Sequence, residues 1–298
     1  MSAPTSLLRP LKDPPPAWAF ELTEAGIAAA EISSAPNISF AELPPDAISP
    51  SPLRDNVTRP DAVLAQIRAL APGDGGRKRR RAALILPDYA IRVTVLDFDD
   101  FPFDVKEQTS LVRFRLKRSV PFDVDSAALS FEARKSAGEG RKVRVTAALA
   151  PLEIVAHYEA PFRLAGFHPG WVTTSTLASL DLVPATGVKV LVKRTGRKLS
   201  LAVVGGGGLD LIRVIELAEA SREEIAGHLF PTLAYVEDQL SSKPDTLLVC
   251  GFGRDTAELG AWLTSEMGVP VEPLSSRLGA PGENNAGLLG YLEGLKEW

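Results

Sequence analysis

The sequence predicts an α/β protein built from two similar lobes. The chain has 298 residues, 45% of them hydrophobic, which is enough for a sizeable core and, at this length, for two lobes or subdomains. Two continuously apolar runs, at 82–86 and 246–250, are typical of buried central strands. Each half also opens with a strand hairpin and later returns to a strand and a helix, which indicates two related lobes.

Local patterns place the elements of the first half. The predicted elements are, in order, strands at 18–22 and 27–32, a helix over 61–70, and strands at 82–87 and 91–98. The turn Thr23-Glu24-Ala25-Gly26 joins the first two strands as a hairpin. A polar, Pro-rich stretch, 35–60, is predicted to be irregular, and Asp61 suits the first turn of the helix that follows.

The middle of the chain, 97–168, is predicted to form an inserted subdomain. Its predicted elements are a helix from Asp104 to before Pro121, strands at 127–133 and 141–149, and a helix over 151–165. Pro121 cannot continue a helix because its ring blocks the preceding turn. Gly166 suits the residue that ends a helix in the left-handed conformation.

The last third is predicted to begin with a three-stranded meander. The predicted elements are strands at 188–192, 199–204 and 209–215, a helix over 222–240, a strand at 246–250, a helix over 256–267, a short strand at 269–271 and a final helix over 287–298. A run of four glycines, Gly205 to Gly208, separates the second and third strands. Glycine suits a phosphate cradle or a tight turn, and its place between two strands favours a reversal that needs positive φ.

Composition excludes several classes of site. The single cysteine, Cys250, excludes an internal disulfide framework and a thiolate metal site. The three histidines are not spaced as metal ligands, so no metal is expected. The net charge of −4 argues against a dedicated nucleic-acid binder.

Two basic clusters, 77–81 and 113–118, stand out against this acidic background. Each is either a solvated flank or a contact for an acidic partner or anionic lipid headgroups. Residues 1–16 are predicted to form a flexible, Pro-rich leader, and they lack the unbroken apolar core of a signal peptide. No stretch approaches the ~18 apolar residues of a spanning helix, so a cytoplasmic protein is expected.

Four stretches carry a resemblance to a known family. They are LILPDYAIRVTVLDFDDFP followed by LVRFRLKRSVPFDVDSAALSFEA, then RLAGFHPGWV, LSLAVVGGGGLDLIRVIEL and LLVCGFGRDTAELGAWLTSEMGVPVEPL. In this order, over residues 17–298, the chain resembles the PilM family of type IV pilus assembly proteins. These are relatives of FtsA and of the cytoplasmic part of the type II secretion L protein.

The resemblance implies an α/β, actin-like (ribonuclease H-like) fold of two lobes. The implied divisions are lobe 1A at 17–96 plus 169–186, an inserted 1C subdomain at 97–168, and lobe 2A at 187–298 with a reduced 2B subdomain at about 218–242. It also implies a cytoplasmic scaffold of pilus biogenesis, at the cytoplasmic face of the inner membrane. Its implied partners are the tail of a PilN-like membrane protein and other pilus assembly proteins, through which it would associate with the membrane.

Apolar residues near the 1A and 1C junction are candidates for the peptide-binding surface. They are Phe98, Phe101, Phe103 and Phe122. Core packing is the alternative for each of them.

The resemblance also implies two Asp-x-Gly turns that would hold ATP and Mg²⁺, and neither is intact. Glu21 and Thr23 replace the Asp and Gly of the first turn, and Lys193 and Thr195 replace those of the second. The second turn, with Gly196, could hold an anion by charge alone or be a solvated hairpin tip. One helix at 222–240 replaces a helical hairpin, so one adenosine wall is missing. Gly251 and Gly253 suit a structural strand-to-helix turn better than a phosphate contact.

A degenerate site without hydrolysis is therefore expected. The degenerate cofactor-binding set is Glu21, Thr23, Lys193, Thr195, Gly196, Gly251 and Gly253. The expected protein is a pseudo-ATPase with no cofactor, no metal and no catalytic residues. The alternatives are an actin-like ATPase with a divergent ATP and Mg²⁺ site, or a type II secretion L-like component. The sequence has no Walker A pattern and no nucleophile elbow, and adjacent Asp residues at 97–100 face opposite sides of a strand.

Overall fold

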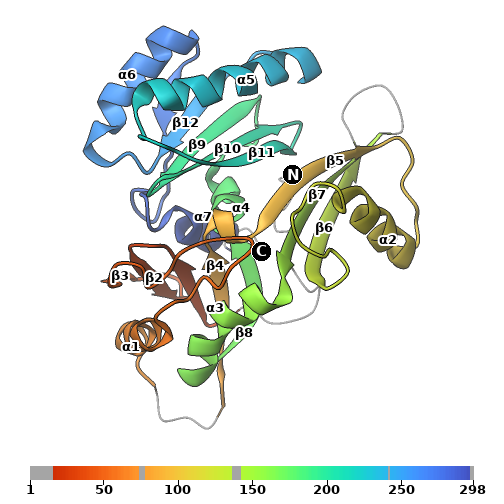
Figure 1. Cartoon of the computed structure of the whole chain (residues 1–298). Helices are drawn as coiled ribbons and strands as arrows, with labels where there is room; N and C mark the ends of the chain where they lie inside the picture. The colour runs from red at the N-terminus through yellow and green to blue at the C-terminus, as the bar shows by residue number, and fades with distance from the viewer. Residues whose placement is uncertain (1–15, 74–77, 136–141, 241, 296–298) are drawn as a thin grey trace.

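The computed structural model describes residues 16–73, 78–135, 142–240 and 242–295, which form two lobes and a smaller side unit (Figure 1). The first lobe is a five-stranded sheet in the order β3-β2-β1-β4-β8. Its strands are β1 (Trp18–Leu22), β2 (Gly26–Glu31), β3 (Ile38–Glu42), β4 (Arg80–Leu86) and β8 (Phe167–Thr174). β1 and β2 form an antiparallel hairpin, whereas β1, β4 and β8 run parallel.

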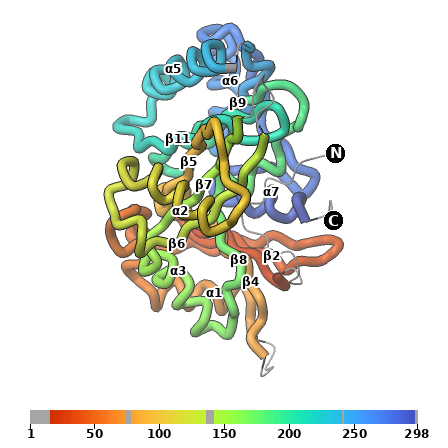
Figure 2. The backbone as a smooth tube through the Cα atoms, turned by 90° about the vertical axis from the view of Figure 1, so that its right-hand side faces the viewer, coloured from red at the N-terminus to blue at the C-terminus, as the bar shows by residue number. Residues whose placement is uncertain are grey.

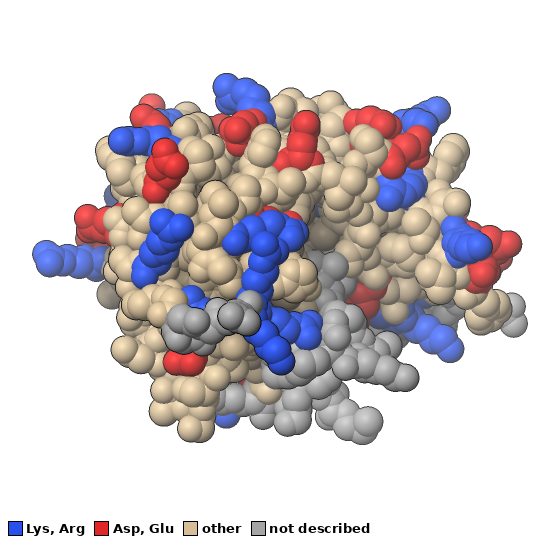
Figure 3. All heavy atoms as spheres, turned by 90° about the horizontal axis from the view of Figure 1, so that it is seen from below, with Lys and Arg blue, Asp and Glu red and all other residues tan. Residues whose placement is uncertain are grey.

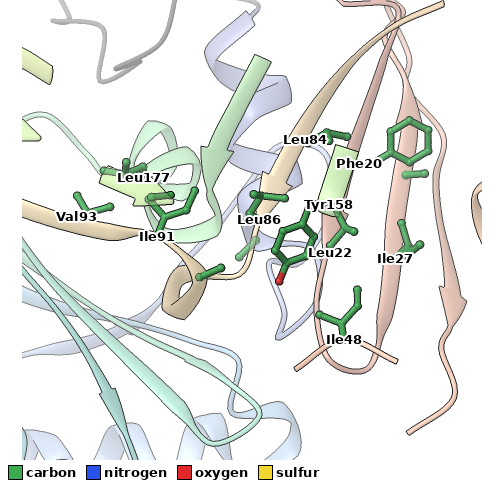
Figure 4. Close-up of a cluster of buried hydrophobic side chains, with 14 of the residues drawn as sticks. Phe20, Leu22, Ile27, Ile48, Leu84, Leu86, Ile91, Val93, Tyr158 and Leu177 are labelled. Atoms are coloured by element: carbon green, nitrogen blue, oxygen red, sulfur yellow. The ribbon is translucent and has the colours of Figure 1, made fainter. Parts of the chain in front are cut away.

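Helices cover both faces of this first sheet. The helices are α1 (Pro60–Leu70) and α3 (Leu152–Leu164) on one face, and α4 (Ser175–Ser179) and α7 (Ala286–Leu295) on the other. Strand side chains alternate between the faces, so Phe20 packs toward α3 and Ala19 toward α7. Figure 4 shows Tyr158 of α3 beside Leu22 and Leu86 in the larger of the two clusters.

The second lobe repeats the strand order of the first. Its sheet is β11-β10-β9-β12-β13. The elements are β9 (Lys189–Thr195), β10 (Lys198–Gly205), β11 (Gly208–Glu216), α5 (Arg222–Leu240), β12 (Thr246–Cys250), α6 (Thr256–Met267) and β13 (Val271–Pro273). α5 and α6 pack on one face. Leu191, Ala202 and Leu248, on the other face, join the apolar cluster of the first lobe, so the lobes share a core.

The glycine run forms the turn between β10 and β11, as predicted. Gly206 and Gly207 have φ values of 56° and 82°, a conformation that glycine adopts at little cost. A Cβ on Gly208 would lie 2.7 Å from Nε of Arg134. The run therefore allows both a tight reversal and a close approach by the side unit.

The side unit is a three-stranded sheet in the order β5-β7-β6 with one helix against it. Its elements are β5 (Arg92–Phe98), α2 (Val105–Leu116), β6 (Ala127–Lys135) and β7 (Val143–Pro151). α2 begins where the Asp104 carboxylate accepts the backbone N–H groups of Lys106 and Glu107 at 2.9 and 3.1 Å. The unit spans 92–151, which differs from the expected 97–168 at both ends. β5 pairs with β7 along its whole length, and α3 packs on the first lobe through Ile154, Tyr158 and Phe162.

Two strands of the first lobe were not predicted. β3 lies within the Pro-rich stretch and forms the sheet edge, where most of its residues are exposed, so it lacks the alternation that marks a half-buried strand. β8 contains Pro169 and Gly170, which weaken a strand signal. None of the described helices is long and apolar enough to cross a membrane.

Candidate functional site between the lobes

The two predicted turns lie at matching places in the two sheets. Glu21 in β1 and Lys193 in β9 each pair with the residue seven positions further along the chain, Ala28 and Ser200. Each also pairs with the central parallel neighbour of its strand, β4 or β12. A threonine follows two residues later in both lobes, so Glu-x-Thr in one lobe corresponds to Lys-x-Thr in the other.

Lys193 is buried and forms an ion pair across the interface between the lobes. Its side chain is 1% exposed, and its Nζ lies 3.0 Å from Oδ2 of Asp88 in the turn after β4. The same Asp88 carboxylate accepts the backbone N–H and the hydroxyl of Thr176, both at 2.7 Å, and the hydroxyl of Ser200 at 2.9 Å. Two donors from each lobe thus meet at one carboxylate, which satisfies the buried charge.

Glu21 is fully buried and connects β1 to two helices of the first lobe. The hydroxyl of Ser175 donates to Oε1, and the backbone N–H of Leu288 donates to Oε2 at 2.7 Å. Glu21 is also within electrostatic reach of Lys193. The ammonium of Lys193 therefore faces two carboxylates of the first lobe, Asp88 and Glu21.

Burial and charge oppose each other in this cluster. Burial raises the pKa of Glu21, against the Lys193 charge and the hydrogen bonds it accepts. Burial alone would also raise the pKa of Asp88, but the Lys193 ammonium and the bonds from Thr176 lower it below its ordinary value. Burial would lower the pKa of Lys193, but Asp88 and Glu21 raise it. Asp88 and Lys193 are consequently charged near neutral pH.

The loop that precedes α7 contacts both hairpin turns, at Thr23 in the first lobe and at Thr195 in the second. We call these the two threonine turns. The Thr23 hydroxyl donates to Oδ1 of Asn284 at 2.9 Å, and the Thr195 hydroxyl donates to the carbonyl of Glu283 at 3.3 Å. The backbone N–H of Gly196 donates to the Glu283 carboxylate at 2.5 Å. A turn amide of this kind is an anion-binding group, and here the anion it binds is a side chain of the same protein.

A cavity of about 20 Å³ remains between the turns. Its lining includes Thr23, Asp88, Ser175, Lys193 and Thr195. This volume suits about one water molecule, whereas ligand sites for molecules of nucleotide size are in the range of several hundred Å³. This cavity is therefore too small for a nucleotide.

Neither a protein-family model nor a curated protein matches the sequence. Solved structures match over nearly the whole chain. A chain of the PilM-PilN type IV pilus biogenesis complex aligns with a TM-score of 0.71 and 20% identity, covering 93% of this chain and 97% of that one. A Bacteroides thetaiotaomicron protein with an actin-like ATPase fold aligns at 0.53, with 12% identity over 92% of this chain and 94% of that one. The fold is actin-like.

A third structure supports the same assignment. The cytoplasmic domain of EpsL, an inner-membrane component of the type II secretion system of Vibrio cholerae, aligns at 0.52 with 12% identity over 94% of both chains. The predicted fold class is confirmed, and so is the likeness to PilM, here as a likeness in structure. The two threonine turns lie in the cleft between the lobes of this actin-like fold.

Gly251 and Gly253 shape the turn between β12 and α6. Gly251 has a φ of 84°, and a Cβ there would lie 1.9 Å from the carbonyl oxygen of Arg194. The Arg194 guanidinium donates to the Gly251 carbonyl at 3.2 Å and lies 5.2 Å from the centre of the Phe252 ring. Gly253 has a φ of 58° and begins a short 3-10 turn. Packing against β9 and positive φ therefore account for these glycines.

Cys250 is buried at the end of β12. Burial raises the pKa of its thiol to about 12, which keeps it protonated. Its Sγ lies 3.5 Å from the carbonyl oxygen of Gly282, in the same loop as Glu283 and Asn284.

The structure separates the four predicted partner-binding phenylalanines. Phe98, Phe101 and Phe122 belong to the core of the side unit, where the rings of Phe98 and Phe101 lie 5.1 Å apart. Phe103, in contrast, is fully exposed just before α2. Core packing accounts for three of the four, and the set does not form one surface.

A second set of ion pairs connects the side unit to the second lobe of the actin-like fold. Asp210 of β11 is 4% exposed and pairs with the guanidinium groups of Arg134 and Arg144, from β6 and β7. Arg144 also pairs with Asp97 of β5 at 2.7 Å. Burial would lower the pKa of Arg144, but Asp97 and Asp210 raise it. Figure 2 shows β5 next to β11 at this contact.

Sequence reasoning missed several residues of the site. They are Asp88, Ser175, Thr176, Ser200, Glu283 and Asn284. Asp88 directly follows the Leu-Pro that ends β4, and an acid at the end of a central strand was the signal available for it. The other five have no distinctive spacing and meet the site through the tertiary fold.

Proposed function

We propose that this chain is a PilM-like scaffold protein of type IV pilus biogenesis and a pseudo-ATPase. In this role it docks the cytoplasmic tail of a PilN-like inner-membrane protein, at the cytoplasmic face of that membrane. The likeness to a chain of the PilM-PilN complex, over 93% of this chain, supports the pilus assignment. The observation that carries the pseudo-ATPase assignment is the buried Lys193–Asp88 ion pair in the cleft.

The residues in the cleft do not fit Mg-ATP. An ammonium group at position 193 repels Mg²⁺ at the place where the resemblance expects a carboxylate. Glu283 already accepts the Gly196 N–H, and the exposed Glu24 lies close by. Both carboxylates repel a triphosphate. Opening the cleft would also separate Lys193 from Asp88 and break the hydrogen bond that Ser200 donates to Asp88.

Internal contacts hold the lobes together instead. Lys193 and Ser200 join the second lobe to Asp88 of the first, and the loop with Glu283 and Asn284 joins both turns. Such a protein presents one fixed surface to its partners without a bound nucleotide. This property suits a scaffold better than a cycling ATPase.

Calorimetric titration of the full chain with Mg-ATP at millimolar concentration tests the pseudo-ATPase assignment. The expected result is no saturable heat and no rise in melting temperature. Saturable binding that weakens on the change Gly253→Ala or Lys193→Met would instead establish the alternative, an actin-like ATPase with a divergent site.

Co-purification tests the scaffold assignment. The chain should bind a single-span membrane protein encoded beside it, through that protein's short cytoplasmic tail. A synthetic peptide of that tail should bind saturably, and a scrambled peptide of the same composition should not. Failure of both the intact partner and the peptide to bind the folded chain would overturn the assignment.

A type II secretion L-like role is the second candidate, on the basis of the EpsL match. Its TM-score of 0.52 is well below the 0.71 of the pilus structure. Binding of a secretion-system partner in place of the pilus tail would favour it.

A further inference from the structure

One end of the first lobe gathers basic side chains from α1, α3, β4 and the residues just before β4. The parallel strands β4 and β8 begin there, with Arg80 beside Phe167 and Arg81 beside His168. α1 and α3 end there, and the Arg68 guanidinium donates to the carbonyl of Leu164 at 3.4 Å. Figure 3, which looks onto this end, shows Lys and Arg side chains gathered near the middle of the face.

We name this surface the basic face. It consists of Arg68, Lys78, Arg79, Arg80 and Arg163. Glu159 is paired with Arg163 at 2.6 Å, and Glu31 lies beyond β1, where it pairs in register with Trp18. The face is strongly positive on a chain whose net charge is −4.

The fold accounts for part of this charge. Arg80 donates to the carbonyls of Ala71 and Pro72 at 2.9 and 3.0 Å, and its guanidinium lies 4.2 Å from the centre of the Phe167 ring. Arg68 and Arg163 occupy the last turns of their helices, where positive charge is stabilising. Lys78 and Arg79 are exposed, and neither has a bonding partner among the described residues. The fold thus does not explain why these two are basic.

An apolar side chain lies within the same face. Leu164 is 67% exposed beside Arg68 and Arg163. Leucine among arginines suits the surface of a bilayer, because the apolar group enters the acyl boundary while guanidinium groups bind headgroup phosphates. The second basic cluster differs, since Arg113 donates to the Ala127 carbonyl at 3.1 Å and Arg115 lies over the Phe98 ring.

We propose that the basic face docks directly onto an anionic lipid bilayer. The contact goes beyond the proposed function because it needs no membrane-protein partner. Each basic residue near an anionic surface contributes on the order of 1 kcal/mol, so several together give measurable, salt-sensitive binding. A nucleic acid is the less favoured ligand, because single strands stack on aromatic rings, and Phe167 is buried while Arg80 lies over Trp18.

Vesicle flotation with the full chain tests this proposal without any partner protein. Vesicles of phosphatidylcholine with about one-third phosphatidylglycerol should bind the chain, and phosphatidylcholine alone should not. The paired change Lys78→Glu and Arg79→Glu should weaken binding by roughly 30-fold or more. Leu164→Ser should weaken it by several-fold with the charge unchanged.

The matched control is the paired change Lys117→Glu and Arg118→Glu just after α2, which alters net charge by the same amount. It should leave vesicle binding within about threefold of the original, because the contact is local. Melting curves of all variants establish that they are folded. The proposal would be overturned if both paired variants lost vesicle binding equally, if the chain did not bind anionic vesicles, or if it bound only a DNA duplex.

Discussion

The two lobes share one strand order but differ in charge at their matching turns. Glu21 in the first lobe and Lys193 in the second occupy the same register, and a threonine follows each of them two residues later. One is an acid and the other a base, and both are fully buried. A repeated architecture can therefore place opposite charges at equivalent positions of its two halves, and here the buried base of one lobe pairs with an acid of the other, Asp88.

Removal of the Lys193 ammonium group should have the largest effect on the free energy of unfolding. Lys193→Met leaves Asp88 buried without its cation, so the free energy of unfolding should fall by about 3–5 kcal/mol. Urea denaturation followed by circular dichroism measures this loss. Lys243→Ala is the matched control, because its pair with Glu237 is exposed and 4.0 Å long, and it should change stability by less than about 1 kcal/mol.

A double variant distinguishes the ion pair from simple packing at position 193. Adding Asp88→Asn to Lys193→Met removes the unpaired charge, so the double loss should be smaller than the sum of the single losses by about 1–3 kcal/mol. Strict additivity would mean that the two side chains are not energetically coupled.

Substitutions in the loop before α7 should lower the free energy of unfolding by an intermediate amount. The loss should depend on which lobe the substituted residue contacts. Glu283→Ala removes a charged acceptor from the Gly196 N–H of the second lobe, at a cost of about 1.5–3 kcal/mol. Asn284→Ala removes a neutral acceptor from Thr23 of the first lobe, at a cost of about 1 kcal/mol. The same denaturation series measures both. A larger loss for Asn284→Ala would reverse the assigned importance of the two turns.

Glu21 should give the smallest effect, seen as a pH slope, because burial and the Lys193 charge oppose each other there. Its pKa is raised, so the folded chain keeps this proton at pH values where the unfolded chain has released it. Stability should therefore fall as pH rises from the ordinary value of 4.5 through the raised pKa. Glu21→Gln should lose this slope, which urea denaturation at a series of pH values would detect. Parallel curves for the two proteins would contradict it.

Asp88 contributes with the opposite sign in the same experiment. Its pKa is lowered, so its contribution to stability is present above its ordinary value of 3.8 and is lost as pH falls through the lowered pKa. The loss of stability at acid pH should persist in Glu21→Gln and disappear in Asp88→Asn. This pair of variants separates the two carboxylates that face Lys193.

Local pattern was enough for most strands and helices. Glu21, Thr23, Lys193 and Thr195 became candidates only through the resemblance to the PilM family, which implies an Asp-x-Gly turn in each of two hairpins. Asp88 lies 105 residues from Lys193, and Asn284 lies 261 residues from Thr23, so their contacts depend on how the lobes pack. The exposed edge strand β3 was missed for a related reason, since its partner β2 and not its own pattern makes it a strand.

The ion pairs that Arg134 and Arg144 form with Asp210 affect how force passes through the molecule. The side unit is inserted in the chain of the first lobe, yet Arg134 and Arg144 bind it to the second. The side unit therefore contacts both lobes, and the two lobes contact each other through the shared apolar core. A pulling force applied to the side unit would therefore be transmitted to both lobes through these contacts.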